Sequence, residues 1–337
     1  MSPGASERFL VTGALGCIGA WTVRAVVRDG RPVVAFDLGN DPRRLRQIMS
    51  PEELSKVAFV AGDITELGAL EAAFDEHEIT NVIHLAALQV PFARADPPLG
   101  AQVNVVGTVN VFEAVKRRKA TTAPVVYTSS IGAFSGDDVD PTTGRLGADA
   151  QAHPMSHYGV YKLANEGNAR VYAADDGIAS IGLRPMTVYG VGRDQGMTSG
   201  PTKAIVAAVL GVPYVVPYDG VTLYQYAEDV AAALLAASRS GLDGAHVFNL
   251  GGSFVDGPGV LEAIDAAVPG SSGLISFETV SLPFPSQIDH SGLEALGPLP
   301  VTPFADGVLA SVAIYRELRE RGQLDPAEQG LAPIAVG

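Results

Sequence analysis

The stretch TGALGCIG, residues 12–19, places three glycines at a fixed spacing directly after the apolar run Phe9–Val11. A strand, a glycine-rich turn and a helix in this order predict the phosphate-binding start of a dinucleotide-binding βαβ unit. The first glycine supplies the tight turn, the second lets main-chain amides approach a phosphate, and the third allows close packing of the helix. A glycine turn without a ligand is the alternative for the motif alone. The pyrophosphate contacts predicted here are Gly13, Gly16, Cys17, Ile18 and Gly19.

Short β-branched runs alternate with longer helical patterns through the first half of the chain. We predict strands at residues 9–12, 32–37, 57–61, 81–86 and 125–129, and helices at 17–28, 66–76, 98–118 and 157–174. This alternation indicates βαβ units, and apolar strands such as VIHLAA indicate a sheet covered on both faces. The expected fold is therefore α/β, a Rossmann-type doubly wound parallel sheet with a smaller C-terminal substrate-binding portion.

The pattern loosens after a further strand in GIASIGLRP, residues 177–185. Helices are predicted at 201–210, 228–238 and 304–321, and short strands near 214–217 and 247–250. We divide the chain into an NAD-binding domain over residues 1–179, a partly interleaved substrate-binding portion over 180–325, and a tail over 326–337. The tail is expected to be extended or disordered.

Composition restricts the class of partner. Hydrophobic residues make up 47% of the 337 residues, which is enough for a buried core, and the net charge of -14 disfavours nucleic acid and anionic membranes. The single cysteine, Cys17, excludes an internal disulfide and a thiol cluster for zinc, and no metal site is expected. No signal-like start and no long apolar segment is present, so we expect a cytoplasmic protein with a small-molecule substrate.

An acidic residue after the second predicted strand tests the dinucleotide hypothesis. Asp37 closes RPVVAFD, at about the 20-residue distance from the glycines where a carboxylate accepts hydrogen bonds from ribose hydroxyls. The same carboxylate would repel a 2′-phosphate, so NAD is favoured over NADP. Arg43 and Arg44 follow, and they either soften this preference or begin a solvated basic helix.

A second set of residues lies in SHYGVYKLANE. Tyr158 and Lys162 are four positions apart and share a helix face. A neighbouring ammonium lowers the pKa of a phenol from about 10, which suits Tyr158 to exchange a carbinol proton. The run Thr128–Ser130 ends a strand at the sheet edge where ligands bind, although turn or cap formation is the alternative. Tyr161 cannot share the lysine's face and is expected to pack.

These motifs, together with AFDL, GDIT, VIHLAALQ, VNVVGTVNVFEA, LRPMTVYGVGR and YQYAEDVAAAL, resemble the extended short-chain dehydrogenase/reductases of the NAD-dependent epimerase/dehydratase type over nearly the whole chain. The resemblance implies that Tyr158 is the general acid/base, that Lys162 lowers its pKa and binds the nicotinamide ribose, and that Ser130 orients the substrate hydroxyl. It implies that Asn104 supports the active-site backbone. The implied cofactor contacts are Asp63, Ile64, Leu85, Ala86, Ala87, Asn104, Thr128, Tyr158, Lys162, Pro185 and Val188.

The chain departs from this pattern at one position. Family members that act on nucleotide-diphosphate sugars usually carry an arginine where this chain has Thr222. A buried diphosphate without a fork of donors is costly to desolvate, which places such a substrate in doubt. Arg193 and Lys203 are alternative anion contacts or solvated loop charges. The candidate substrate contacts are Gln89, Arg94, Ser130, Arg193, Thr198 and Ser199.

We therefore favour an NAD-dependent dehydrogenase that moves a hydride between nicotinamide and a secondary alcohol or ketone of a small sugar, sugar acid or hydroxy compound. A sugar or nucleotide-sugar epimerase/dehydratase with tightly bound NAD is the first alternative. A non-catalytic dinucleotide-binding sensor or scaffold is the second. The resemblance also implies a homodimer formed by the helices that contain Asn104 and Tyr158.

Overall fold

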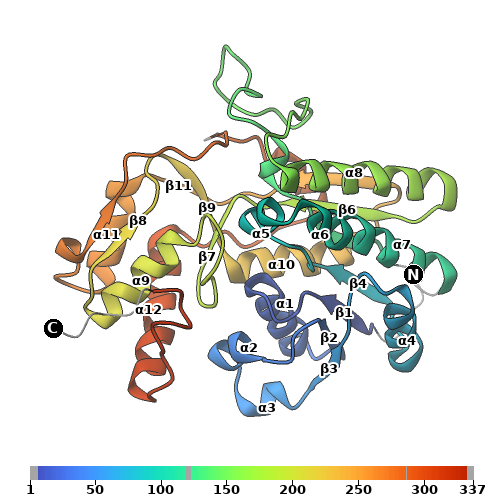
Figure 1. Ribbon diagram of the computed structural model, residues 1–337, viewed down its shortest axis with the longest axis horizontal. Coiled ribbons are helices and arrows are strands. Elements are labelled where there is room, and N and C mark those ends of the chain that lie inside the picture. Colours follow the sequence, from blue (N-terminus) through green and yellow to red (C-terminus); the bar gives the residue numbers. More distant parts are fainter. Residues whose placement is uncertain (1–6, 119–122, 286, 332–337) are drawn as a thin grey trace.

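The computed structural model describes residues 7–118, 123–285 and 287–331. Its central sheet contains seven parallel strands in the order β10-β6-β5-β4-β1-β2-β3 (Figure 1). This order reverses between β1 and β4, as in doubly wound folds, and the predicted fold class is confirmed. The strands are β1 (Phe9–Thr12), β2 (Val33–Asp37), β3 (Val57–Ala61), β4 (Asn81–His84), β5 (Val125–Thr128), β6 (Ser180–Arg184) and β10 (Ala245–Asn249).

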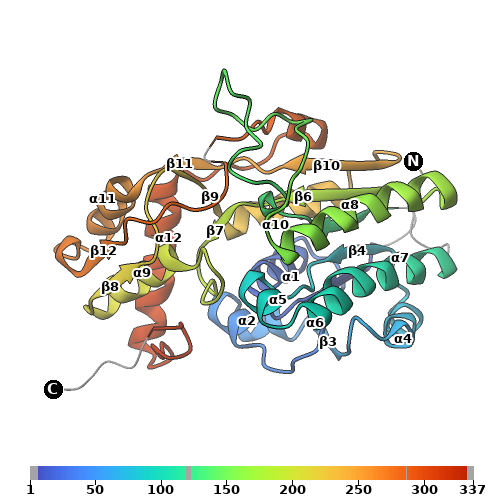
Figure 2. The same ribbon diagram turned by 45° about the horizontal axis from the view of Figure 1, so that its top comes forward.

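Helices cover both faces of this sheet because its strands are apolar on both sides. On β1, Leu10 packs into one hydrophobic cluster and Val11 into another, on the opposite face. Helices α1 (Cys17–Arg28) and α10 (Ala227–Ser238) lie on the Val11 side. Helices α4 (Leu67–His77), α7 (Gly107–Arg118) and α8 (His157–Asp176) lie on the Leu10 side, as two views show (Figures 1 and 2).

The helix predicted over residues 98–118 is three consecutive pieces. Helix α6 (Pro97–Ala101) is followed by a π-helical turn, η1 (Gln102–Val106), and then by α7. The Asp96 side chain caps α6 by accepting a hydrogen bond from the Leu99 amide at 3.0 Å. π-Helical turns inside helices often mark functional sites, and this one contains Asn104.

A smaller lobe, on the left in Figure 1, contains α9 (Gly200–Leu210), α11 (Gly257–Ala267) and α12 (Phe304–Glu320). It includes a three-stranded sheet of β11 (Ser253–Val255), β9 (Thr222–Tyr226) and β7 (Thr187–Tyr189), and the pair β12 (Ile275–Phe277) and β8 (Tyr214–Val216). Elements β7, β9, β11, β12 and α11 were not predicted, because they are short or closely follow glycine and proline. The remaining elements are α2 (Arg43–Ile48), α3 (Pro51–Leu54), α5 (Val90–Ala95) and the 3-10 turns Ile131–Ala133, Ser272–Leu274 and Ser291–Leu296.

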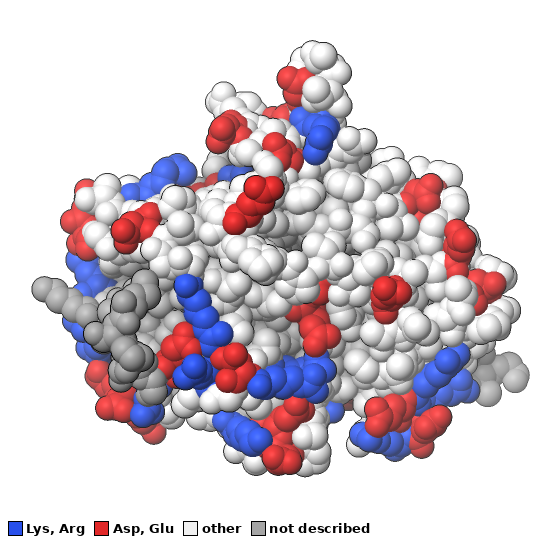
Figure 3. Space-filling view, turned by 180° about the vertical axis from the view of Figure 1, so that it is seen from behind, with Lys and Arg blue, Asp and Glu red and all other residues white. Residues whose placement is uncertain are grey.

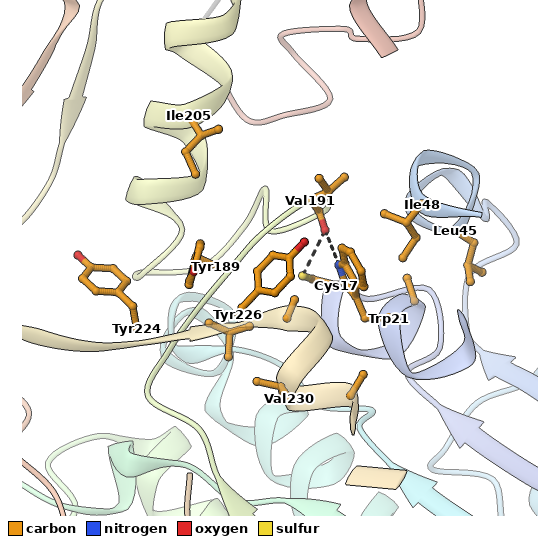
Figure 4. Close-up of a cluster of buried hydrophobic side chains, with 14 of the residues drawn as sticks. Cys17, Trp21, Leu45, Ile48, Tyr189, Val191, Ile205, Tyr224, Tyr226 and Val230 are labelled. Atoms are coloured by element: carbon orange, nitrogen blue, oxygen red, sulfur yellow. Dashed lines mark hydrogen bonds between the residues drawn. The ribbon is translucent and has the colours of Figure 1, made fainter. Parts of the chain in front are cut away.

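One continuous hydrophobic cluster joins the sheet to the smaller lobe (Figure 4). Trp21 of α1 donates its indole N–H to the Val191 carbonyl at 2.9 Å, and the Cys17 thiol approaches the same oxygen at 3.8 Å. The Trp21 ring also contacts Tyr226 of β9, with centroids 5.6 Å apart. Helix α1, which follows the glycine turn, is therefore anchored to the smaller lobe.

The described part of the predicted tail does not extend into solvent. Gln329 is 1% exposed and Leu331 is 7% exposed, and Leu331 belongs to the main hydrophobic cluster. Arg43 of α2 donates a hydrogen bond to the Glu328 carbonyl at 2.7 Å. The expectation of an extended or disordered end is therefore wrong as far as residue 331, because a leucine anchors the chain in the core. Residues 332–337 lie outside the described residues.

The charged side chains do not form one basic patch on the face that Figure 3 shows. Acidic and basic side chains lie interspersed along the lower edge of this face. Among the residues that the structure describes, no helix has both the length and the apolar character needed to cross a bilayer.

Candidate active site

A cavity of about 1000 Å³ opens at the carboxyl ends of the central strands, where doubly wound folds bind their ligands. It begins at the glycine turn after β1 and continues past the ends of β2, β4 and β5 to the N-terminal turn of α8. The predicted cofactor contacts that line it are Gly13, Gly16, Cys17, Ile18, Gly19, Asp37, Asp63, Ile64, Leu85, Ala86, Ala87, Thr128, Tyr158, Lys162, Pro185 and Val188. Asn104 alone of that set is not in the lining.

The glycine turn has no room for side chains at two of its positions. Gly13 has φ +66°, and a Cβ there would lie 2.6 Å from the Ala86 amide nitrogen. A Cβ at Gly19 would lie 2.1 Å from the Gly13 carbonyl oxygen. The backbone is therefore packed as a dinucleotide pyrophosphate site requires, with the start of α1 facing the cavity. These residues fit NAD.

The acidic group expected at the ribose is in place at the end of β2. The Asp37 carboxylate accepts hydrogen bonds from the Leu15 amide at 2.9 Å and from the Gly39 amide at 3.2 Å. It lines the cavity together with Leu38 and Asn40. The carboxylate is thus held next to the glycine turn, where it can accept bonds from ribose hydroxyls.

Arg43 and Arg44 do not form a solvated basic helix start. Their guanidinium groups bind the buried Asp194 carboxylate at 2.6 and 2.7 Å. Arg44 also donates to the Leu15 and Gly192 carbonyls, at 2.8 and 3.1 Å. Because both guanidinium groups already bind the Asp194 carboxylate, they have few donors left for a 2′-phosphate. The preference for NAD over NADP therefore stands.

Asn104 acts from behind the cavity wall. Its side chain is 1% exposed, accepts a hydrogen bond from the Leu88 amide at 2.7 Å and donates one to the Leu88 carbonyl at 2.9 Å. Leu88 lines the cavity and lies in the loop between β4 and α5. The amide therefore fixes the backbone of that loop.

The buried His84 connects the glycine turn with the π-helical turn η1 through two threonine hydroxyls. His84 was not predicted as a site residue. His84 Nδ1 lies 2.7 Å from the Thr12 hydroxyl, and Nε2 lies 2.9 Å from the Thr108 hydroxyl. The Thr108 hydroxyl donates to the Asn104 carbonyl, so it must accept from Nε2–H, which leaves Nδ1 to accept from Thr12. Burial lowers the pKa of His84 to about 3. The only signal in the sequence was one polar residue inside the apolar strand VIHLAA.

Tyr158, Lys162 and Ser130 converge on the far end of the cavity. Lys162 Nζ donates to the Thr128 carbonyl at 2.7 Å and lies 5.5 Å from the centroid of the Tyr158 ring. Helix α8 presses closely on the 3-10 turn after β5, because a Cβ at Gly159 would lie 2.1 Å from the Gly132 carbonyl oxygen. This contact holds the phenol of Tyr158 beside Ser130.

Burial dominates the protonation of the pair on α8. It raises the pKa of the Tyr158 phenol, while a hydrogen bond with Ser130 and the positive charge of Arg193 act in the opposite direction. Burial lowers the pKa of Lys162 to about 8, against the attraction of Glu166. The expected depression of the Tyr158 pKa by Lys162 is therefore not found, because the ammonium is directed to the Thr128 carbonyl and desolvation of the phenol outweighs it.

The two serines that follow β5 have different environments. Ser129 donates to the buried Glu166 carboxylate at 2.5 Å, and Arg184 binds the same carboxylate through Nε at 2.8 Å and Nη2 at 2.7 Å. Ser130 caps the 3-10 turn by accepting from the Gly132 amide at 3.0 Å and lines the cavity. Ser129 is thus held by a buried ion pair, whereas Ser130 faces the site.

The candidate substrate and anion contacts lie in three different places. Gln89, Ser130, Arg193 and Thr198 line the main cavity. Ser199 and Lys203 line a neighbouring cavity of about 570 Å³ instead, and Arg94 is exposed at the end of α5. Thr222, at the position of the missing arginine, is buried in β9 with its hydroxyl 3.3 Å from that of Thr187.

Comparison with known proteins identifies the family. The model of the NAD dependent epimerase/dehydratase family matches residues 9–251. The chain belongs to this family. A UDP-glucose 4-epimerase of Mycolicibacterium smegmatis is 31% identical over 92% of this chain and 98% of its own length.

Solved structures agree. The NAD complex of Thermus thermophilus UDP-glucose 4-epimerase superposes with a TM-score of 0.74 at 27% identity, covering 92% of this chain and 99% of that one. A partial consensus L-threonine 3-dehydrogenase shares the fold, with a TM-score of 0.80 at 23% identity over 92% of this chain and 100% of that one. This member of the epimerase/dehydratase family is thus an NAD-dependent enzyme of the short-chain dehydrogenase/reductase superfamily, and the predicted class and cofactor are confirmed.

Proposed function

We propose that this enzyme oxidises a secondary alcohol, or reduces the corresponding ketone, with Tyr158 exchanging the proton of the carbinol oxygen. The observation that carries the proposal is the convergence of Tyr158, Ser130 and Lys162 on the cavity that begins at the glycine turn. NAD supplies the hydride acceptor at its nicotinamide when bound. The protein's own groups position the substrate and move its proton.

Each of the three residues has a separate task. Ser130 accepts a hydrogen bond from the Gly132 amide, and its hydroxyl proton, which bonds the Tyr158 phenol, would be donated to the substrate oxygen when the substrate binds. Tyr158 takes the carbinol proton during oxidation and returns it during reduction. Lys162, held at the Thr128 carbonyl, lines the same cavity and would donate to the nicotinamide ribose, while the positive charge of Arg193 favours the ionised phenol. The glycine turn and Asp37 would hold the pyrophosphate and a ribose of the cofactor.

We infer that the reaction is a net dehydrogenation of a small sugar, sugar acid or hydroxy compound. Thr222 replaces the arginine that usually neutralises a nucleotide diphosphate, and its hydroxyl is directed to Thr187. Arg43 and Arg44 are engaged by Asp194. A buried diphosphate would therefore find few donors near the reacting end of the cavity.

The test is a screen of sugars, sugar acids and hydroxy acids with NAD and with NADP, in which the absorbance of the reduced cofactor measures turnover. We expect turnover with NAD, and a loss of about 100-fold or more in kcat for Tyr158→Phe, which lacks the exchangeable proton. Tyr161→Phe is the matched control, because Tyr161 lies on the same helix and its hydroxyl only donates to the Pro97 carbonyl at 2.8 Å. Equal kcat values for wild type and Tyr158→Phe would contradict the proposal.

A second candidate function, epimerisation of a nucleotide sugar, is favoured by the 31% identical UDP-glucose 4-epimerase that matches nearly the whole chain. An epimerase returns the hydride to the substrate, so it predicts no net reduced cofactor. Incubation with UDP-glucose, followed by chromatography of the products and by dialysis to test retention of NAD, separates the two. Conversion of UDP-glucose without accumulation of NADH would replace the dehydrogenase proposal.

We also propose a homodimer formed through η1, α7 and α8. Three valines on these elements are exposed, with Val106 and Val160 at 46% and Val171 at 57%. Apolar side chains grouped on two neighbouring helices suit burial against a second copy. Sedimentation at micromolar concentration should give a dimer for the wild type and a monomer for Val160→Lys with Val171→Lys. A wild-type species of 34.9 kDa would contradict this proposal.

We also propose that the chain divides into an NAD-binding domain over residues 1–179, a substrate-binding portion over 180–325 and a tail over 326–337. We propose the cytoplasm as its compartment. The position of β10 beside β6 supports the interleaving of the first two parts. The single cysteine supports a reducing compartment. Cell fractionation tests the compartment, and limited proteolysis tests the division.

A further inference from the structure

Two polar atoms at the substrate end of the main cavity have no partner. Gln89 Oε1 and Arg193 Nε are buried, and neither has a hydrogen bond to any described residue. Both residues line the cavity that also contains Tyr158 and Ser130. Buried polar atoms are nearly always paired in folded proteins, so an unpaired donor and an unpaired acceptor in one binding cavity indicate a ligand that pairs them.

The loop between β7 and α9 brings these two side chains together. Gly196 has φ +98°, and a Cβ at this position would lie 2.1 Å from Gln89 Oε1 and 3.1 Å from Arg193 Nη2. Arg193 Nη2 also donates to the Thr198 hydroxyl at 3.3 Å. A glycine at position 196 is thus what allows Gln89, Arg193 and Thr198 to form one polar cluster.

The charge of this cluster is not neutralised by the protein. No carboxylate of the described ranges forms an ion pair with Arg193. The nearest acidic residue in sequence, Asp194, is already bound by Arg43 and Arg44 at 2.6 and 2.7 Å. The positive charge of Arg193 also acts on the Tyr158 phenol, whose pKa it lowers against the effect of burial. A cation without a counterion therefore lies at the reacting end of the cavity.

We propose that Arg193, Gln89 and Thr198 form an anion-binding site for a carboxylate of the substrate, so that the enzyme acts on a small hydroxy acid. This inference rests on the proposed dehydrogenase function. A guanidinium binds a carboxylate through a planar fork of donors, and the glutamine amide can hydrogen-bond a second polar group of the same molecule. One cation with two neutral partners suits a single carboxylate, whereas a diphosphate would require more positive charge.

The experiment measures binding to the NAD-loaded enzyme by isothermal calorimetry, so it can be done before the substrate is identified. The probes are 3-hydroxybutyrate, malate and gluconate, the neutral amide of each acid, and UDP. We expect at least one acid to bind about 10-fold or more tightly than its amide, as charge-assisted pairing implies. Arg193→Met should abolish this difference, and Arg193→Lys should retain part of it. Arg145→Met removes an exposed arginine outside the cavity and should bind as the wild type does.

Several outcomes would overturn the inference. These are equal affinity of the wild type for every acid and its amide, no binding of any acid, and unchanged acid binding by Arg193→Met. Binding of UDP without binding of any acid would also overturn it and assign the anion to a nucleotide diphosphate. If Arg193→Met does not fold, Gln89→Leu gives a second test, with weaker acid binding expected and unchanged binding contradicting the proposal. Failure of the dehydrogenase proposal would give a different result from failure of this inference, because acids would then bind selectively but would not be oxidised.

Discussion

His84 illustrates how burial sets the protonation of a single side chain. It lies on β4 between the hydroxyls of Thr12 and Thr108 and is 4% exposed. A charged imidazole there would lose its hydration and would have no acid to pair with, so its pKa falls from 6.5 to about 3. The neutral ring can then accept from one threonine and donate to the other. These two hydrogen bonds connect the end of β1 with the start of α7.

The first prediction concerns stability in acid. The folded protein binds fewer protons at His84 than the unfolded chain between pH 6.5 and about pH 3. Stability contributed by this group is therefore complete above pH 6.5 and falls as the pH decreases towards 3, by up to about 1.4 kcal/mol per pH unit. Urea unfolding across this range should show a weaker pH dependence for His84→Asn than for the wild type.

His246→Asn is the matched control, because His246 bonds only the Asp243 carbonyl near the surface. Its unfolding free energy should follow that of the wild type at each pH. Parallel pH curves for His84→Asn and the wild type would show that the buried imidazole is not the titrating group.

The second prediction separates strain from contact at the glycine turn. Gly13→Ala introduces a Cβ that meets the Ala86 amide nitrogen at 2.6 Å, whereas Gly30→Ala has a similar φ of +74° but nothing within 4 Å. Both variants carry the cost of a left-handed residue, about 1 kcal/mol. Only Gly13→Ala should also weaken NAD binding, by about 10-fold or more, since it displaces the loop against the pyrophosphate site. Equal NAD affinities in fluorescence titration would contradict this account.

At the scale of elements, the loop between β7 and α9 connects the two ends of the cavity. Its residue Arg193 faces the substrate end, and its neighbour Asp194 binds Arg43 and Arg44 of α2. Arg44 in turn donates to the Leu15 carbonyl inside the glycine turn at 2.8 Å. One buried carboxylate thus joins the substrate loop, α2 and the cofactor turn.

The third prediction tests this junction. Asp194→Asn leaves the partly buried Arg44 guanidinium without a counterion and Arg43 with only the Glu328 carboxylate, 3.9 Å away, and should reduce the free energy of unfolding by about 3 kcal/mol. It should also raise the KM for NAD, because the glycine turn loses support. Asp41→Asn is the comparison, since Asp41 pairs with Arg46 while both side chains are more than half exposed. Its effect should stay within about 1 kcal/mol, and an equal loss in both variants in urea unfolding would contradict the role of Asp194.

At the scale of the whole molecule, the C-terminal turn, residues 326–331, packs against the junction that Asp194 forms with Arg43 and Arg44. Arg43 donates to the Glu328 carbonyl, and Gly330 lines the neighbouring cavity. Leu331 is 7% exposed in the main hydrophobic cluster, which also contains α1 and the smaller lobe. The end of the described chain therefore contributes to the core that holds the two parts together.

The fourth prediction measures this contribution. Leu331→Ala should lower the free energy of unfolding by about 2 kcal/mol, the low end for a buried leucine, because a chain end can partly collapse around the cavity. Leu309→Ala removes the same atoms from a side chain of α12 that is 57% exposed, and surface changes of this kind stay within about 0.5 kcal/mol. Thermal unfolding of both variants checks the difference. A Tm for Leu331→Ala as high as that of Leu309→Ala would mean that the turn is not docked in solution.

Sequence patterns predicted most of the central sheet but few details of the smaller lobe. Strands such as β1 and β3 were located from local apolar runs, because their order and spacing are local properties. Strand β9 and the π-helical turn η1 were missed, since one is stabilised by pairing with distant β7 and β11, and the other lies inside a longer helical pattern. In the candidate site, the positions of Tyr158 and Lys162 followed from spacing, whereas their protonation did not.

The sequence by itself determined that this chain forms a doubly wound sheet with a glycine turn and a tyrosine and lysine on one helix face, because strand order, turn chemistry and helical periodicity are encoded by neighbouring residues. Only the tertiary structure decided that Asp194 engages Arg43 and Arg44, that Leu331 is docked, and that burial governs the pKa of Tyr158. Desolvation and ion pairing depend on groups brought together from distant parts of the chain, and spacing along the sequence does not specify those distances.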